Sequence, residues 1–156
     1  MKTTEELQEK YKSMLQLHYG ISCGNGWVGL LDRALLKIQR YLEWKSRYGN
    51  NPPLEFTIST IKEKFGGLRI YFEGGDEYIS GIIGFVEDFS YSICENCGTN
   101  QNVGRTNGWI RSICEPCSKN PEVNPKGNEW YSPDKLDEIR KAQASTFGTS
   151  PLSQPD

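Results

Sequence analysis

The chain has 156 residues, of which 36 % are apolar and 24 % charged, and its formal net charge is −2. This length suits a single domain with a small appendage. The acidic balance argues against a dedicated nucleic-acid-binding protein, because such proteins usually carry a strongly basic surface. The longest uncharged apolar run, Tyr78–Val86, is far shorter than the ~20 residues needed to cross a bilayer, so we expect no membrane association.

Two helices are predicted in the first third of the chain. Thr3 and Glu6 match a capping box, so a helix is expected from Thr3 to about His18, before Gly20. After a loop at Ile21–Gly26, a second helix is indicated by apolar residues at three- and four-residue steps: Trp27, Leu31, Leu35, Ile38 and Leu42. Its opposite face is either solvated or a surface for an acidic partner, and it carries Arg33, Lys37, Arg40 and Trp44.

The middle of the chain predicts a β-hairpin followed by a third helix. Apolar and polar residues alternate over 54–59, and Leu68–Phe72 follows after a glycine turn, which indicates two antiparallel strands. From Asp76 onward, apolar residues recur with helical spacing and are expected to be buried: Ile79, Ile82, Ile83, Val86, Phe89 and Ile93. The polar face of this helix is expected to comprise Ser80, Glu87 and Asp88.

The turn of this hairpin is a candidate anion site. Gly66 and Gly67 can expose backbone N–H groups, and Lys64 and Arg69 flank them, so the four residues together suit a phosphate or a carboxylate. The alternative is an ordinary hairpin turn, in which the glycines supply positive φ angles and the charges are solvated.

Four cysteines occur as two CxxC pairs with sixteen residues between them: Cys94, Cys97, Cys114 and Cys117. This spacing is typical of a structural zinc site with four sulfur ligands, which leaves no open position for a substrate or a catalytic water. The alternatives are four unrelated buried thiols or two disulfides, and disulfides need an oxidising compartment. Residues 1–12 are charged and lack the apolar core of a signal peptide, so we expect a cytoplasmic protein with Zn²⁺ as structural cofactor.

Cys23 is the fifth cysteine, and two interpretations remain open for it. Its Cys-Gly-Asn-Gly loop leads into a helix, a setting that can lower the pKa of a thiol and create a nucleophile. A nucleophile also needs a base, and His18 is the only histidine in the chain. The alternative is a small buried apolar residue, which is common for free cysteine. No catalytic residue is assigned.

The C-terminal part predicts a β-ribbon at Val103–Ile113, a loop at Asn120–Asn128 and a helix that begins at Ser132-Pro133. The helix is expected to end near Ala144. The composition of residues 145–156 is typical of a disordered tail.

Several of these motifs also support a resemblance. Residues 74–78 (GGDEY) are similar to a five-residue signature of diguanylate cyclases, but the helical pattern that starts at Ile79 favours a glycine turn before a helix. Together with Cys23–Trp27, Glu63–Arg69 and the paired cysteines, this segment resembles a group of small phage and prophage proteins over about residues 20–118. The resemblance implies a phage accessory gene expressed in a bacterial cytoplasm, and it supplies no activity.

The sequence therefore predicts an α+β fold, with three helices around a small antiparallel sheet in residues 1–93. A zinc-ribbon or treble-clef-like unit is expected at 94–130, packed on this core, followed by a helix at 131–144 and the tail. The function expected first is non-enzymatic binding of a host protein, with a role in counter-defence. Three alternatives remain: a binder or sponge of a phosphorylated small molecule, a Cys23-dependent enzyme, and a nucleic-acid-binding regulator.

Overall fold

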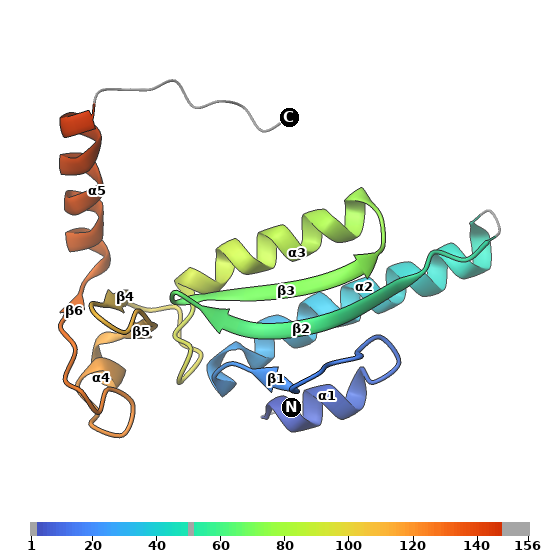
Figure 1. The fold of residues 1–156 in the computed structure, drawn as a ribbon, viewed down its shortest axis with the longest axis horizontal. Helices are drawn as coiled ribbons and strands as arrows, with labels where there is room; N and C mark the ends of the chain where they lie inside the picture. The colour runs from blue at the N-terminus through green and yellow to red at the C-terminus, as the bar shows by residue number, and fades with distance from the viewer. Residues whose placement is uncertain (1–2, 50–51, 148–156) are drawn as a thin grey trace.

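The computed structural model describes residues 3–49 and 52–147, and it shows an α+β protein (Figure 1). The elements, with η marking short 3₁₀ helices, are α1 (Thr4–Lys10), β1 (Ile21–Ser22), η1 (Asn25–Trp27), α2 (Val28–Tyr48), β2 (Phe56–Lys64), β3 (Gly67–Gly74), α3 (Glu77–Phe89), η2 (Ser90–Ser92), β4 (Val103–Thr106), β5 (Ser112–Cys114), α4 (Glu115–Ser118), β6 (Trp130–Tyr131) and α5 (Pro133–Phe147).

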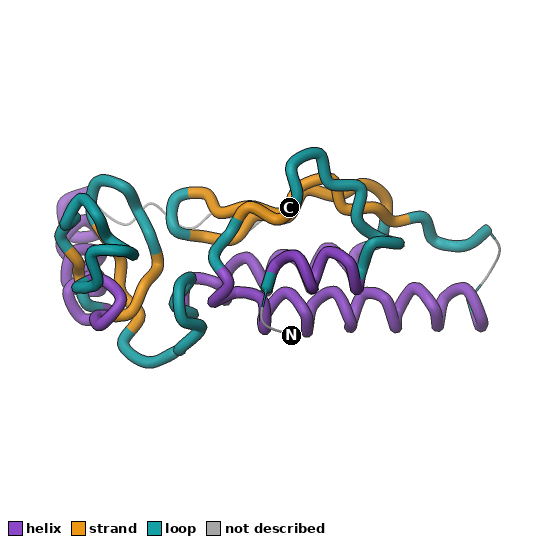
Figure 2. The backbone as a smooth tube through the Cα atoms, turned by 90° about the horizontal axis from the view of Figure 1, so that it is seen from below, coloured by secondary structure: helices purple, strands orange, loops and turns teal. Residues whose placement is uncertain are grey.

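The larger sheet has the strand order β1-β2-β3. As predicted, β2 and β3 form an antiparallel hairpin, with Lys64 opposite Gly67 next to the turn. Strand β1 adds to β2 in parallel, so Ile21 and Ser22 belong to the sheet and not to the loop expected there. Helices α2 and α3 both lie on one side of the sheet (Figure 2), so only one face of the hairpin packs into the core.

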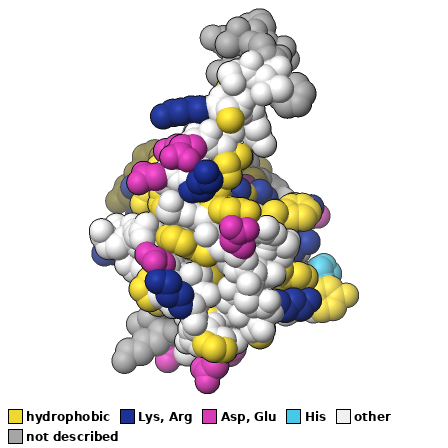
Figure 3. Space-filling view, turned by 90° about the vertical axis from the view of Figure 1, so that its left-hand side faces the viewer, with side chains coloured by type: hydrophobic (Ala, Val, Ile, Leu, Met, Phe, Trp, Pro, Cys, Tyr) yellow, Lys and Arg dark blue, Asp and Glu magenta, His cyan; other side chains and the backbone are white. Residues whose placement is uncertain are grey.

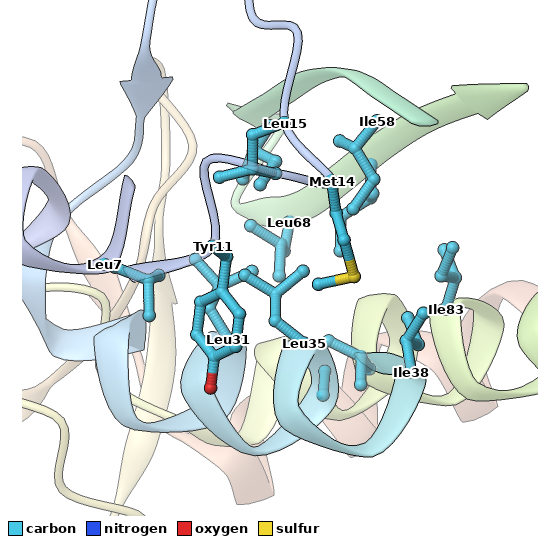
Figure 4. Packing of buried hydrophobic residues seen from close by; sticks show 14 of the residues in the cluster. Leu7, Tyr11, Met14, Leu15, Leu31, Leu35, Ile38, Ile58, Leu68 and Ile83 are labelled. Atoms are coloured by element: carbon cyan, nitrogen blue, oxygen red, sulfur yellow. The ribbon is translucent and has the colours of Figure 1, made fainter. Parts of the chain in front are cut away.

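The core lies between these helices and the sheet. The apolar stripe of α2 is buried as expected at Leu31, Leu35 and Ile38, and Figure 4 shows these side chains pointing toward Ile58 and Leu68 of the hairpin. The cluster is completed by Leu7 of α1, by Tyr11 directly after α1, and by Ile79, Ile83 and Val86 of α3. Burial of large apolar side chains is the main source of stability here, at about 1.5–3 kcal/mol for each one fully buried.

The prediction for α3 was wrong at two positions. Phe89 was expected in the core but is 41 % exposed. Glu87 was expected on the polar surface, yet its carboxylate accepts the backbone N–H of Ile70 at 2.8 Å. The hydroxyl of Ser90 likewise accepts the N–H of Leu68 at 2.9 Å. Because β3 is an edge strand, these two side chains satisfy N–H groups that have no neighbouring strand to bond.

The first helix is shorter than predicted. Thr3 caps it through a hydrogen bond from the N–H of Glu6, as the capping box indicates, but α1 ends at Lys10 instead of near His18. The N–H of Gln16 donates to the carbonyl oxygen of Ile58, and the N–H of Ile58 donates to Met14, both at 2.9 Å. This pairing with β2 requires extended backbone, so it ends the helical segment before these residues.

The C-terminal third forms a second three-stranded sheet, in the order β5-β4-β6, with the predicted ribbon present as β4 and β5. Helix α5 starts after Ser132, whose hydroxyl accepts the N–H of Lys135, and it continues past Ala144 to Phe147. Residues 145–147 therefore belong to the helix and not to the predicted tail, and 148–156 lie outside the described residues. Within the described part, no helix combines the length and apolar character needed to cross a membrane.

Candidate functional site

The four predicted cysteine ligands come together in one cluster. Cys94 and Cys97 lie on a turn after η2, Cys114 ends β5, and Cys117 lies in α4. The first turn is closed by a hydrogen bond from the N–H of Gly98 to the carbonyl oxygen of Cys94 at 2.9 Å. Gly98 has a φ of +79°, a conformation that residues with a side chain rarely adopt.

The geometry of this cluster suits a tetrahedral metal ion. Its sulfur atoms all lie within 4.8 Å of one another, and the Sγ atoms of Cys97 and Cys114 are 3.7 Å apart. Tetrahedral bonds of about 2.3 Å place two sulfur ligands about 3.8 Å apart. Cys94, Cys114 and Cys117 are buried together with Ile113, so the cluster also forms a small core of its own. The four thiols could therefore hold a metal ion.

The segment Cys23–Trp27 joins this metal centre to the larger core. The N–H of Gly24 donates to the Glu95 carboxylate at 3.0 Å, and the N–H of Gly26 donates to the Glu95 carbonyl oxygen at 2.8 Å. The indole N–H of the fully buried Trp27 donates to Ile93 at 2.9 Å. A Cβ atom at Gly26 would lie 2.2 Å from the carbonyl oxygen of Cys94, so only glycine permits this approach. The motif thus has a structural role in holding the first CxxC turn.

Glu95 is the centre of this joint. It is only 6 % exposed, and its second carboxylate oxygen pairs with Nε of Arg111 at 3.3 Å. The Arg111 guanidinium also donates to the carbonyl oxygen of Val123 at 2.7 Å, so the carboxylate is linked to the loop after α4 as well. The sequence analysis assigned no role to Glu95. A glutamate inside a CxxC turn gives no signal of its own.

A cleft of about 920 Å³ lies beside this joint and contains Cys23. Burial, followed by the nearby carboxylates of Glu95 and Glu63, raises the pKa of the Cys23 thiol to about 12. The thiol is therefore protonated near neutral pH and is a poor nucleophile.

The candidate anion turn joins β2 to β3 and lies next to β5, which ends at Cys114 (Figure 1), and several of its backbone groups are already bonded. The N–H of Gly66 donates to the Glu63 carboxylate at 2.7 Å, and its carbonyl oxygen accepts the Ser112 hydroxyl at 2.6 Å. A Cβ atom at Gly67 would meet the ring of Tyr91 at 2.4 Å. The two glycines thus allow close packing, and the charged groups of Lys64 and Arg69 remain as the part of this turn able to contact an anion.

The other predicted partner-binding residues are exposed along α2: Arg33, Lys37, Arg40 and Trp44. Arg33 and Lys37 border a groove of about 550 Å³ between α2 and α3, whose apolar lining includes Leu30, Ile82 and Phe85.

Exposed aromatic side chains surround this groove. On α3, Tyr78 is 44 % exposed, Phe85 is 65 % exposed, and Phe85 stacks on Phe89 with ring centroids 5.5 Å apart. On α2, Tyr41 lies 4.3 Å from Tyr78, measured between ring centroids. We call this surface the α2–α3 face, defined by Arg33, Lys37, Tyr41, Trp44, Tyr78, Ile82, Phe85 and Phe89. The sequence reading assigned part of this apolar set to the core.

The GGDEY segment has a structural role at one end of the α2–α3 face. Asp76 caps α3 by accepting the N–H of Ile79 at 3.2 Å, and it also accepts the hydroxyl of Tyr41 at 2.6 Å. This hydrogen bond raises the pKa of Tyr41 to about 12 and lowers the pKa of Asp76. The segment therefore fixes α3 against α2, in agreement with a glycine turn before a helix.

No protein-family model, no curated protein and no solved structure matches the chain.

Proposed function

We propose that this chain is a non-enzymatic binding protein, stabilised by a structural zinc ion, that binds a partner protein through the α2–α3 face. The observation that carries the proposal is the exposure of large aromatic side chains around one apolar groove. Soluble proteins seldom leave such residues grouped on the surface unless the patch binds something. Phe85, at 65 % exposure, is the most accessible aromatic residue of α3.

Zinc is the metal best suited to the four-cysteine cluster. Thiolate ligands favour soft or borderline ions, and four-sulfur tetrahedral sites are typical of structural zinc. The order of elements supports a treble-clef-like unit: a CxxC turn, the β4–β5 hairpin, and a second CxxC that enters the short helix α4. Four protein ligands fill the coordination sphere, so the ion contributes folding energy and does not activate a substrate.

The partner should offer an apolar surface with carboxylates at its edge. Arg33 and Lys37 border the groove, and Arg40 and Trp44 extend the same side of α2. A partner helix with apolar residues on one face and acidic residues beside them would match both the groove and its border. Figure 3 looks at the end of the molecule that carries β4–β6 and α5, and on the described residues of that face hydrophobic, basic and acidic side chains are interspersed.

The resemblance to phage and prophage proteins gives this binding a biological setting. A phage accessory protein acts in the cytoplasm of the infected bacterium, and its partner would be a host protein, with counter-defence as the expected role. The competing proposal of a Cys23-dependent enzyme is weakened by the raised pKa of the thiol and by the two carboxylates near it.

Matched baits test the proposal. The wild-type chain, Phe85→Asp and Tyr19→Asp are immobilised and exposed to host lysate, and bound proteins are quantified by mass spectrometry. Tyr19 is a matched control because it is 94 % exposed and lies in the loop before β1. We expect one protein to be enriched by the wild type and by Tyr19→Asp and reduced at least about tenfold with Phe85→Asp, since a central aromatic contact contributes about 2 kcal/mol or more. Equal enrichment by all three baits would refute the assignment of this face.

A further inference from the structure

The hairpin has a second face, which points away from α2 and α3. In the β2–β3 register, Ile61 and Ile70 form one pair and are buried toward the helices. Side chains alternate along a strand, so the next pair, Lys62 and Arg69, points to the opposite face. Lys64 and Tyr71 point the same way. We call this the open sheet face and define it by Lys62, Lys64, Arg69 and Tyr71.

Basic groups from two sheets meet at the ring of Tyr91, next to this face. Tyr91 covers Gly67 and accepts a hydrogen bond from the Arg69 guanidinium at 2.9 Å. Arg105 of β4 lies over the same ring, with its Cζ atom 4.4 Å from the ring centroid. Four positive charges thus lie around the turn end of the hairpin: those of Lys62, Lys64, Arg69 and Arg105.

These charges are not neutralised by ion pairs, although Glu87 acts on Arg69 through space and Asp88 and Asp137 line the same pocket as Arg105. None of the ion pairs formed by residues 3–49 and 52–147 involves any of the four. Lys62 lies directly opposite Arg69, and like charges in that position destabilise a sheet. The one carboxylate on the same side of β3 is Glu73, which lies near the other end of the hairpin, opposite Thr57. An anion bound between Lys62 and Arg69 would offset this repulsion.

Two exposed aromatic side chains lie among the basic residues. Tyr71 is 45 % exposed, and the Nζ atom of Lys62 lies 5.5 Å from its ring centroid. Phe65 is 67 % exposed at the tip of the turn, where its φ of +53° is a conformation that bulky residues rarely adopt. Asparagine or glycine would occupy that position without strain. An exposed phenylalanine at this position therefore lowers stability. Backbone strain of this kind is frequent at functional sites.

We infer that the open sheet face binds single-stranded nucleic acid. Lysine and arginine contacts would neutralise phosphates, and the rings of Tyr71 and Phe65 would stack on unpaired bases, as in other open-sheet and groove-type binders of single strands. An acidic peptide would use the four charges but would gain little from the two rings. Duplex DNA would use the charges alone, because its bases are already stacked.

This activity goes beyond the proposed function and uses a different surface. The net charge of −2 is an average over the chain, whereas a short oligonucleotide would contact only the positive charges of the open sheet face.

Fluorescence anisotropy with labelled dT and rU oligonucleotides of about 12 nucleotides tests the inference, since that length covers one binding face. Four phosphate contacts predict a slope of about −2.8 for log K against log salt, or about 50-fold weaker binding between about 50 mM and about 200 mM salt. Tyr71→Ala should weaken binding about 5- to 150-fold. Lys62→Ala and Lys64→Ala should each reduce the slope by about 0.7.

Controls separate the two surfaces and exclude misfolding. Arg33→Ala and Lys37→Ala remove basic residues from the α2–α3 face and should leave oligonucleotide binding unchanged. Phe85→Asp should weaken binding of the protein partner and leave oligonucleotide binding unchanged. Lys62 and Lys64 form no hydrogen bond or ion pair through their ammonium groups that the fold depends on, so their variants should keep the wild-type melting temperature. Three results would overturn the inference: no binding at about 100 µM protein in low salt, tighter binding of a duplex of the same length, or full affinity in Tyr71→Ala.

Discussion

Substitution of Glu95 by alanine should weaken the joint between the metal centre and the core. The carboxylate accepts the N–H of Gly24 at 3.0 Å and pairs with Arg111 at 3.3 Å, and the side chain is nearly fully buried. A hydrogen bond to a charged group contributes about 1.5–3 kcal/mol, and a partly exposed ion pair adds about 1 kcal/mol. Glu95→Ala should therefore lower the free energy of unfolding by about 2.5–4 kcal/mol.

Thermal and urea denaturation measure this effect. For a chain of this size, 1 kcal/mol corresponds to about 2–4 °C in melting temperature, so a decrease of about 5–16 °C is expected. Glu95→Gln keeps an oxygen that can accept the Gly24 N–H and loses the charge, so it should show about half of the effect. Glu122→Ala removes an exposed carboxylate nearby and should change stability by less than about 0.5 kcal/mol.

Measurement of bound zinc shows whether Glu95 supports the contact between the metal centre and the core or the metal site itself. All three variants keep the four cysteines, so each should retain the same amount of bound zinc as the wild type. If Glu95→Ala unfolds with the stability of the wild type, the contacts of Glu95 do not hold the joint. If instead it loses its zinc while the larger core stays intact, Glu95 serves the metal site alone.

Three further predictions concern the metal ion, the orientation of α3 and the cap of α3. Purified protein should contain one zinc ion per chain by elemental analysis, and Cys97→Ser should lose it and melt earlier; protein free of metal would disprove the zinc assignment. Ile83→Ala should cost about 2–5 kcal/mol in urea unfolding and Phe89→Ala under about 1 kcal/mol, because only the first is buried; equal costs would contradict the orientation of α3. The hydrogen bond from Tyr41 lowers the pKa of Asp76 from 3.8, so its contribution is complete above that pH and is lost as the pH falls through the lowered value. When the pH is lowered below about 4, the melting temperature of Asp76→Asn should therefore fall less than that of the wild type. If the melting temperatures of the two proteins fall in parallel, the hydrogen bond between Tyr41 and Asp76 does not contribute to stability.

The sequence was sufficient where the signal is local. The CxxC spacing predicts the cysteine cluster, the Thr3–Glu6 capping box predicts the start of α1, and the periodicity of α2 predicts which of its residues are buried. The cap and the helix periodicity depend on residues close together in the chain. The metal cluster needed one further assumption, that the two pairs fold back onto each other.

The remaining features depend on contacts between distant segments. The predicted extension of α1 to His18 failed because Met14 and Gln16 bond to Ile58, more than forty residues away. Helical periodicity placed Phe89 in the core and Glu87 on the surface. In the structure, Glu87 and Ser90 face the sheet, where they accept the free N–H groups at the edge of β3. No local pattern states which strand is at an edge.

The open sheet face could not be predicted from the sequence, because it too depends on contacts between distant segments. Lys62 and Arg69 are neighbours only through the register of the hairpin, and Arg105 reaches the same ring of Tyr91 from the second sheet. Net charge is an average over the whole chain, so it cannot reveal four basic groups on one surface. The strain at Phe65 is likewise a property of the folded turn and not of its composition.

Site-specific photo-crosslinking in living host cells tests the central claim most directly. A photoreactive phenylalanine analogue is placed at Phe85, on the α2–α3 face, or at Tyr19, which is more exposed than Phe85 but lies in the loop before β1. The proposal predicts one discrete crosslinked host protein from position 85 and none from position 19. Crosslinks of equal yield from both positions, or none from position 85, would contradict binding through this face.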